Sequence, residues 1–107
     1  MPKFLVRHRA TVDIDGIADY IADSNPKMAI AFYDEAQTIF NLLGDTPKLG
    51  SKIDLILPLE IRMFPMGKFK SYLVFYVVEK EVPNIIRVIH GRRDIEALFD
   101  DDMPLSD

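Results

Sequence analysis

The chain contains no cysteine and no long apolar run. Without cysteine, disulfide bonds and thiolate metal sites are excluded. No segment approaches the roughly 18 consecutive apolar residues of a membrane-spanning helix. The first seven residues also lack the apolar core of a signal peptide. The sequence therefore predicts a cytoplasmic protein that makes no contact with a membrane, and no metal-ligand spacing or cofactor motif is present.

Positive charge is also scarce. The chain has 13 lysines and arginines against 17 acidic residues, a formal net charge of −4, which argues against a generic nucleic-acid binder held by bulk charge. We also expect no direct sequence-specific DNA binding by this chain. The bases nevertheless gather in one part of the chain. They are Arg62, Lys68, Lys70, Lys80, Arg87, Arg92 and Arg93. A locally basic surface could steer an anionic partner, although ordinary solvated faces explain the same pattern.

Length and composition predict one packed domain over 1–107. The 107 residues are 49% hydrophobic, which suits one core and is marginal for two. No repeat or linker divides the chain. We expect 100–107, which are rich in aspartate, to form a flexible acidic tail.

Two amphipathic helices are expected after a short strand over 3–8. The first helix should span 10–23, and Asp13 and Asp15 near its start would suit the helix dipole. Its apolar stripe consists of Ile14, Ile17, Ala18 and Ile21. The few residues that follow it require the next helix to fold back as an antiparallel hairpin.

The second helix should span 26–43. Asn25 is a favoured N-cap and Pro26 a favoured first residue. Gly44 stands where a left-handed C-cap belongs. The following residues, 44–58, are rich in glycine and proline and predict a loop.

The second half of the chain has the period of strands. Strands are expected over 59–64, 68–79 and 84–90, joined by short turns as an antiparallel meander, with a short C-terminal helix near 94–99. The predicted fold is α+β, in the order β-α-α-β-β-β: an antiparallel sheet, the helical hairpin packed on one face, and a short C-terminal helix.

The long strand over 68–79 is apolar on both faces. One face carries Phe69, Leu73, Phe75 and Val77, and the other carries Tyr72, Val74, Tyr76 and Val78. The hairpin can cover only one face. We therefore expect the other face to be covered by the C-terminal helix or by a partner, and part of it to be exposed in the free chain.

The end of the last strand concentrates groups that bind anions or move protons. Arg87, His90, Arg92 and Arg93 lie within seven residues around Gly91, which suggests a site for a protein, for nucleic acid or for a cleavage reaction. Structural roles explain the same residues: His90 could bond to the backbone, and Arg87 could pair with an acid such as Glu79 or Asp94. Arg62 could anchor an ion pair.

The chain resembles the RelE/ParE superfamily of toxins from type II toxin–antitoxin modules, most closely its ParE-like branch. In the first half the marks are Ala10, Asp13-Ile14, the run Ile17 to Ala22, Asn25-Pro26, Ala29 and Phe32. In the second half they are Leu43, Pro47, Gly50, Ile61-Arg62, Gly67, Tyr76 and the run Arg87 to Asp94. The resemblance covers nearly everything from Arg9 to Phe99 and implies the same fold.

The resemblance also implies a cognate antitoxin. Such a partner is usually a small ParD-like ribbon-helix-helix dimer whose C-terminal segment wraps the toxin, giving a hetero-oligomer. Apolar rows at helical spacing and an uncovered sheet face would suit this binding. The residues expected to contact the antitoxin are Ile17, Tyr20, Ile21, Phe32, Tyr33, Tyr72, Val74 and Tyr76.

ParE-like proteins are similar in function to inhibitors of DNA gyrase that catalyse nothing themselves and trap the enzyme on DNA. This resemblance implies gyrase as the target. The residues expected to bind it are Arg87, His90, Arg92 and Arg93. No cofactor and no metal is implied.

Two alternatives stay open. The RelE branch is similar to ribosome-dependent ribonucleases, whose chemistry needs a base, an acid and positive charge on the phosphate. The residues that could supply these roles by type are Arg62, Lys68, Lys70, Arg87, His90 and Arg92. Strand alternation would place Arg87 and His90 on opposite faces, which weakens this reading. The other alternative is a protein-interaction module without toxicity.

Overall fold

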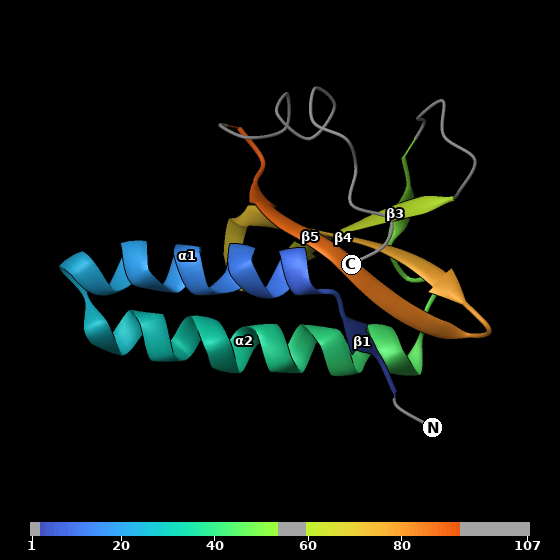
Figure 1. The fold of residues 1–107 in the computed structure, drawn as a ribbon, viewed down its shortest axis with the longest axis horizontal. Helices are drawn as coiled ribbons and strands as arrows, with labels where there is room; N and C mark the ends of the chain where they lie inside the picture. Colours follow the sequence, from blue (N-terminus) through green and yellow to red (C-terminus); the bar gives the residue numbers. More distant parts are fainter. Residues whose placement is uncertain (1–2, 54–59, 93–107) are drawn as a thin grey trace.

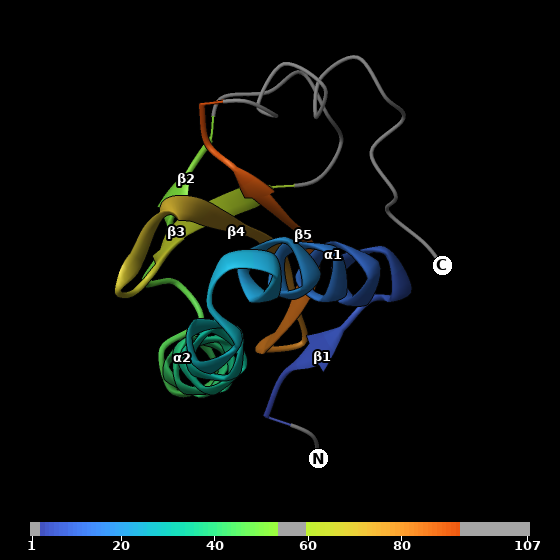
Figure 2. The same ribbon diagram turned by 90° about the vertical axis from the view of Figure 1, so that its left-hand side faces the viewer.

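The computed structural model describes residues 3–53 and 60–92. Its elements are β1 (Leu5–Val6), α1 (His8–Ser24), α2 (Pro26–Asp45), β2 (Ser51–Lys52), β3 (Ile61–Met66), β4 (Phe69–Glu79) and β5 (Val82–His90). Figure 1 shows the two helices side by side on one side of the sheet, and Figure 2 views them from the end. No helix in this described part is long and apolar enough to cross a membrane. Arg93, the predicted C-terminal helix and the acidic tail lie outside the described residues.

The sheet confirms the α+β class but not a purely antiparallel arrangement. Its strand order is β1-β5-β4-β3-β2, and β1 runs parallel to β5. The remaining neighbours are antiparallel, as the meander predicted. The helical hairpin and the strands β2, β3 and β4 separate β1 from β5 along the chain, and β5 then pairs with β1. The backbone N–H of Arg7 donates to the carbonyl of Ile85 at 2.9 Å where β1 ends.

The two edge strands of the sheet, β1 and β2, depart furthest from the prediction. β1 holds only two of the six residues expected over 3–8, since α1 already begins at His8. β2 lies inside the predicted loop over 44–58, where Ser51 pairs with Met63. A strand of two residues is too short to show any alternation of side chains, so its sequence carries no strand signal.

Local capping explains where α2 begins, and close packing against the N-terminal segment explains why a glycine stands near its end. The side chain of Asn25 accepts a hydrogen bond from the Met28 N–H at 3.2 Å, with Pro26 as the first helical residue, as predicted. The expected left-handed cap at Gly44 is wrong, because the helix continues to Asp45. A Cβ at Gly44 would lie 2.8 Å from the carbonyl oxygen of Lys3. This glycine therefore permits contact with the N-terminal segment.

Two tight turns set the register of the long strands. Gly67, at φ +52°, makes the turn between β3 and β4, and Glu35 of α2 accepts a hydrogen bond from the Lys68 N–H there at 2.6 Å. The turn between β4 and β5 uses Lys80 and Glu81 at φ 51° and 65°. Positive φ at both central residues is the signature of a type I′ hairpin, which usually carries asparagine and glycine.

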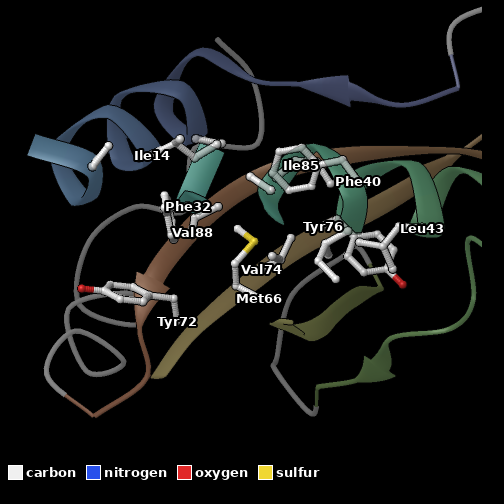
Figure 3. Close-up of a cluster of buried hydrophobic side chains, with 14 of the residues drawn as sticks. Ile14, Phe32, Phe40, Leu43, Met66, Tyr72, Val74, Tyr76, Ile85 and Val88 are labelled. Carbon is white, nitrogen blue, oxygen red and sulfur yellow. The ribbon is translucent and has the colours of Figure 1, made fainter. Parts of the chain in front are cut away.

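The main core lies between the helical hairpin and the sheet (Figure 3). Phe32 of α2 anchors it through edge-on ring contacts with Phe69 and Tyr72, at centroid distances of 5.1 and 5.6 Å. The buried members are Ala10, Ile14, Ala18, Ala29, Phe32, Ala36, Ile39, Phe40, Leu43, Met66, Tyr72, Val74, Tyr76, Ile85 and Val88. Burying each large side chain contributes about 1.5–3 kcal/mol.

Both faces of the long strand are buried, so the expected exposure of part of one face is not observed. The C-terminal helix that was expected to cover it lies outside the described residues. Tyr72, Val74 and Tyr76 face the hairpin and are buried by it. The opposite face holds a second buried cluster, and none of its members is more than 5% exposed. They are Ile61, Phe75, Val77, Ile86 and Ile89. Neither face of the described sheet therefore offers a broad apolar surface to a partner.

A β-bulge changes the alternation along β5. Phe75 pairs with Arg87, but Tyr76 pairs with Ile85, so one extra residue, Ile86, enters β5. Ile85 and Val88 consequently both join the core under the hairpin, although an odd number of positions separates them. The bulge lies before Arg87, and the pairing from Arg87 to His90 is regular, so the alternation expected to place these two residues on opposite faces of the sheet is not interrupted between them.

Candidate functional site

Arg87, expected to bind a target, is instead tied to the first helix. Its Nε lies 2.8 Å from Oδ2 of Asp13, and its Nη2 lies 3.3 Å from Oδ1. The same carboxylate accepts the Val88 N–H at 3.0 Å. Only 9% of the Arg87 side chain and 11% of the Asp13 side chain are exposed. This bidentate ion pair fixes α1 along β5 and leaves Arg87 little surface for a ligand.

Arg62, another residue considered for catalysis, holds a loop. Its guanidinium donates to the carbonyls of Lys48 at 3.1 Å and Gly50 at 2.7 Å, and lies 3.1 Å from Glu60. The Tyr76 hydroxyl completes this clamp, accepting from the Gly50 N–H at 2.8 Å and donating to the Pro47 carbonyl at 2.7 Å. Burial raises the pKa of that hydroxyl. The arrangement pins the segment after α2 to the sheet.

Lys68 lies apart from both arginines. It occupies the turn between β3 and β4 and lines an open pocket beside α2, whose other charged members are Asp34 and Glu35. Carboxylates in this pocket oppose the binding of an anion such as phosphate. Lys68 is therefore not part of a shared site with Arg62 and Arg87.

His90 and Arg92 do meet in one place. They line an open pocket of about 460 Å³ together with Lys70, Ser71, Leu73 and Gly91. We call this the β4–β5 pocket, because it lies where β4 begins and β5 ends. It joins three basic side chains and one hydroxyl, and no carboxylate lines it among the described residues. Such a set favours the binding of an anion.

Strand pairing positions the β4–β5 pocket. His90 pairs with Tyr72 across the strands, and their rings meet edge-on at a centroid distance of 5.3 Å. The Gly91 N–H donates to the Ser71 carbonyl at 2.8 Å. A Cβ on Gly91 would lie 2.9 Å from Cδ1 of Leu73, so glycine allows the two strand ends to close together. The pocket walls are thus held by backbone and ring contacts.

One hydrogen bond indicates which ring nitrogen of neutral His90 carries the proton. Its Nδ1 accepts the backbone N–H of Arg92 at 3.2 Å. A neutral imidazole that accepts at Nδ1 carries its proton on Nε2. In the neutral His90 ring the hydrogen-bond donor is therefore Nε2.

The residues expected to contact an antitoxin divide into two groups. Phe32, Tyr72, Val74 and Tyr76 belong to the core buried under the hairpin, so they are not exposed to a partner in this structure. Ile17 and Ile21 are half-buried against that core. Tyr20 is 62% exposed and Tyr33 is 45% exposed on the hairpin.

Tyr33 links the two helices. Its hydroxyl donates to Oδ1 of Asp15 at 2.7 Å. This hydrogen bond is the main reason that the pKa of Tyr33 rises to about 12, and the charges of Asp15 and Asp19 add to the effect. The hairpin therefore carries a tyrosine next to two carboxylates on its exposed side.

Reasoning from sequence missed Asp13 as the partner of Arg87 and left Ser71 unassigned. Asp13 had been explained by the helix dipole, but α1 begins at His8, so Asp13 lies beyond the first turn. Ser71 could have been found from the strand register, since the turn at Lys80 and Glu81 brings the start of β4 to the end of β5. Within the described residues, no cluster of three or more potential metal ligands occurs.

Comparisons with known proteins agree with this architecture. The profile of the ParE toxin of the type II toxin–antitoxin system parDE matches residues 4–95. A solved structure from the chromosomal ParDE TA system from P. aeruginosa is similar, with a TM-score of 0.65 and 15% identity, over 82% of this chain and 96% of that chain. No match was found among curated proteins. The profile match spans most of the sequence, and the chain therefore belongs to the ParE toxin family of type II toxin–antitoxin systems.

Proposed function

We propose that this chain is a cytoplasmic toxin that inhibits DNA gyrase without catalysing a reaction itself. The β4–β5 pocket carries the proposal, because it gathers anion-binding groups at the strand end where a target site was expected. His90 and Arg92 belong to this pocket. Arg93 lies outside the described residues, and we include it as a target contact from its position in the sequence. Arg87 is set aside, since Asp13 occupies its guanidinium.

The distribution of basic residues favours binding over RNA cleavage. Cleavage by a 2′-hydroxyl requires a base, an acid and positive charge around a single phosphate. Arg62 and Arg87 serve internal contacts, and Lys68 lines another pocket. Of the ribonuclease set, only Lys70, His90 and Arg92 come together. One histidine among cations supports an anion-binding role more directly than acid–base chemistry.

The ribonuclease alternative keeps one observation in its favour. His90 is a titratable group beside two cations in an open pocket, and this arrangement also occurs where a phosphodiester reacts. Two assays separate the possibilities. Purified chain is added to gyrase with relaxed plasmid, and in parallel to ribosomes that carry a message. Loss of supercoiling with intact message supports the proposal, whereas cleaved message with normal supercoiling would overturn it.

We further propose that a ParD-like ribbon-helix-helix antitoxin neutralises the chain by forming a hetero-oligomer. Tyr20 and Tyr33 are the expected antitoxin residues that the hairpin exposes, beside Asp15 and Asp19. Ile17 and Ile21 border this surface as half-buried residues. An amphipathic helix with apolar and basic side chains would complement such a surface. The hairpin surface around Tyr20 and Tyr33 replaces the sheet face as the proposed docking surface.

Co-expression tests the antitoxin proposal. Expression of the chain alone should arrest bacterial growth, and expression with the protein encoded by its neighbouring gene should restore it. Tyr20→Glu with Tyr33→Glu should weaken co-purification of that protein, while Lys27→Glu, an exposed change elsewhere on α2, should not. Normal growth with the chain alone would instead favour an interaction module without toxicity.

A further inference from the structure

We infer that the β4–β5 pocket binds a phosphate of the DNA backbone. The inference rests on the proposed function, since the DNA in question is the one bound by gyrase. Lys70 and Arg92 supply charge, and Ser71 supplies a hydroxyl donor. Phosphate oxygens are acceptors for lysine, arginine and serine side chains in protein–DNA complexes. The pocket therefore matches phosphate in both charge and hydrogen-bonding type.

Arg92 is distinguished from the other described arginines by having no carboxylate partner within 3–53 and 60–92. Arg7 pairs with Glu79, and Arg9 and Arg87 both lie near Asp13. Arg62 pairs with Glu60. Among the described residues, neither Arg92 nor Lys70 forms an ion pair. The guanidinium of Arg92 thus keeps its planar set of donors for an external anion.

The pocket is also organised before any ligand arrives. The backbone bond from Gly91 to Ser71 and the ring contact between Tyr72 and His90 hold its two strands together. A binding site whose walls are already fixed loses less conformational entropy when it binds a ligand.

The charge of the whole chain limits how the pocket can be used. A net charge of −4 opposes tight binding to free DNA. A contact with one backbone phosphate reads no base sequence, which agrees with the expected lack of sequence-specific binding. The contact would matter most when gyrase already holds DNA near the toxin, because the effective concentration of phosphate is then high.

Amide NMR spectra of the full chain test the inference. A short DNA duplex is added at low salt, and an RNA duplex of the same sequence is added in a parallel titration. We expect DNA to shift the amide signals of Ser71, Gly91 and Arg92. The double variant Lys70→Ala with Arg92→Ala should weaken this binding by at least about tenfold and reduce the slope of log affinity against log salt by about one.

A matched double variant controls for charge. Lys27→Ala with Lys48→Ala removes the same charge from exposed positions outside the pocket and should leave the shifts unchanged. Shifts centred elsewhere, equal losses in both double variants, or a response to RNA alone would overturn the inference. Supercoiling is measured separately for the wild-type chain. Pocket shifts without inhibition of gyrase would sink the proposed function, and inhibition without pocket shifts would sink the phosphate site.

Discussion

At the scale of single residues, Asp13 joins the first helix to the last strand. Its carboxylate holds the buried Arg87 guanidinium and the Val88 N–H together. Asp13→Asn keeps an acceptor but removes the opposing charge. Because an uncompensated charge then stays buried, we expect the free energy of unfolding in urea to fall by about 3 kcal/mol.

A matched control uses the other arginine near Asp13. Arg9 is 47% exposed and lies 3.8 Å from the same carboxylate, so Arg9→Ala should change stability by less than about 0.5 kcal/mol. Asp13→Leu with Arg87→Met should cost less than the sum of the two single changes, since no lone charge remains. A loss below about 1 kcal/mol for Asp13→Asn would contradict a structural role for the pair.

Tyr33 offers a pH-dependent test at the same scale. Its hydroxyl donates to Asp15, which raises the pKa of Tyr33 from 10.0 to about 12. The raised value means that this contact stabilises the fold below pH 10, and that the contribution is lost as the pH rises through about 12. Asp15→Asn should bring the pKa of Tyr33 back toward 10, and ultraviolet titration of the tyrosine measures this change. An unchanged titration in Asp15→Asn would contradict the assigned hydrogen bond.

Sequence reasoning succeeded at residues whose role is local and failed where the partner is distant. Asn25 and Pro26 act on their own helix, so their capping role could be read directly. Asp13 and Arg87 are 74 positions apart, and no local pattern reveals their contact. Half of the expected antitoxin residues proved buried for the same reason, because an apolar pattern does not say which element covers it.

At the scale of elements, the turn between β4 and β5 is the clearest mismatch between residues and geometry. Lys80 and Glu81 adopt positive φ, where side chains with a Cβ are strained. Replacing them by asparagine and glycine should raise the free energy of unfolding by about 1 kcal/mol. Lys80→Ala with Glu81→Ala, which keeps a Cβ at both positions, should give no such gain. A loss of stability with asparagine and glycine would contradict the turn geometry.

The long elements were predictable, and the edges of the sheet were not. α1, α2 and the strands β3 to β5 are long enough to show their periods. The two-residue strands β1 and β2 show none, so the parallel pairing at one edge and the extra strand at the other were missed. A register counted from the Lys80–Glu81 turn would pair Ser71 with His90. The bulge at Ile86 shifts the partner of His90 to Tyr72. The sequence could therefore have predicted the position of the pocket with an error of one residue.

At the scale of the whole molecule, an acidic protein carries a basic pocket that no carboxylate lines among the described residues. The other described arginines form ion pairs within the fold, so a chain that is net negative can still present positive charge at this pocket. Long-range repulsion between the chain and DNA weakens as salt screens it, while a contact inside the pocket acts at short range. We therefore assign recognition to the pocket rather than to total charge.

The most direct test is the concentration of chain that half-inhibits gyrase supercoiling, measured for the wild type, Arg92→Ala and Lys27→Ala. All three should unfold at similar urea concentrations, because exposed changes usually cost within about 0.5 kcal/mol. We predict that the wild type and Lys27→Ala inhibit equally and that Arg92→Ala requires at least about tenfold more protein. This ratio corresponds to a loss of about 1.4 kcal/mol in binding free energy. Equal inhibition by folded Arg92→Ala, or no inhibition by the wild type, would contradict the account.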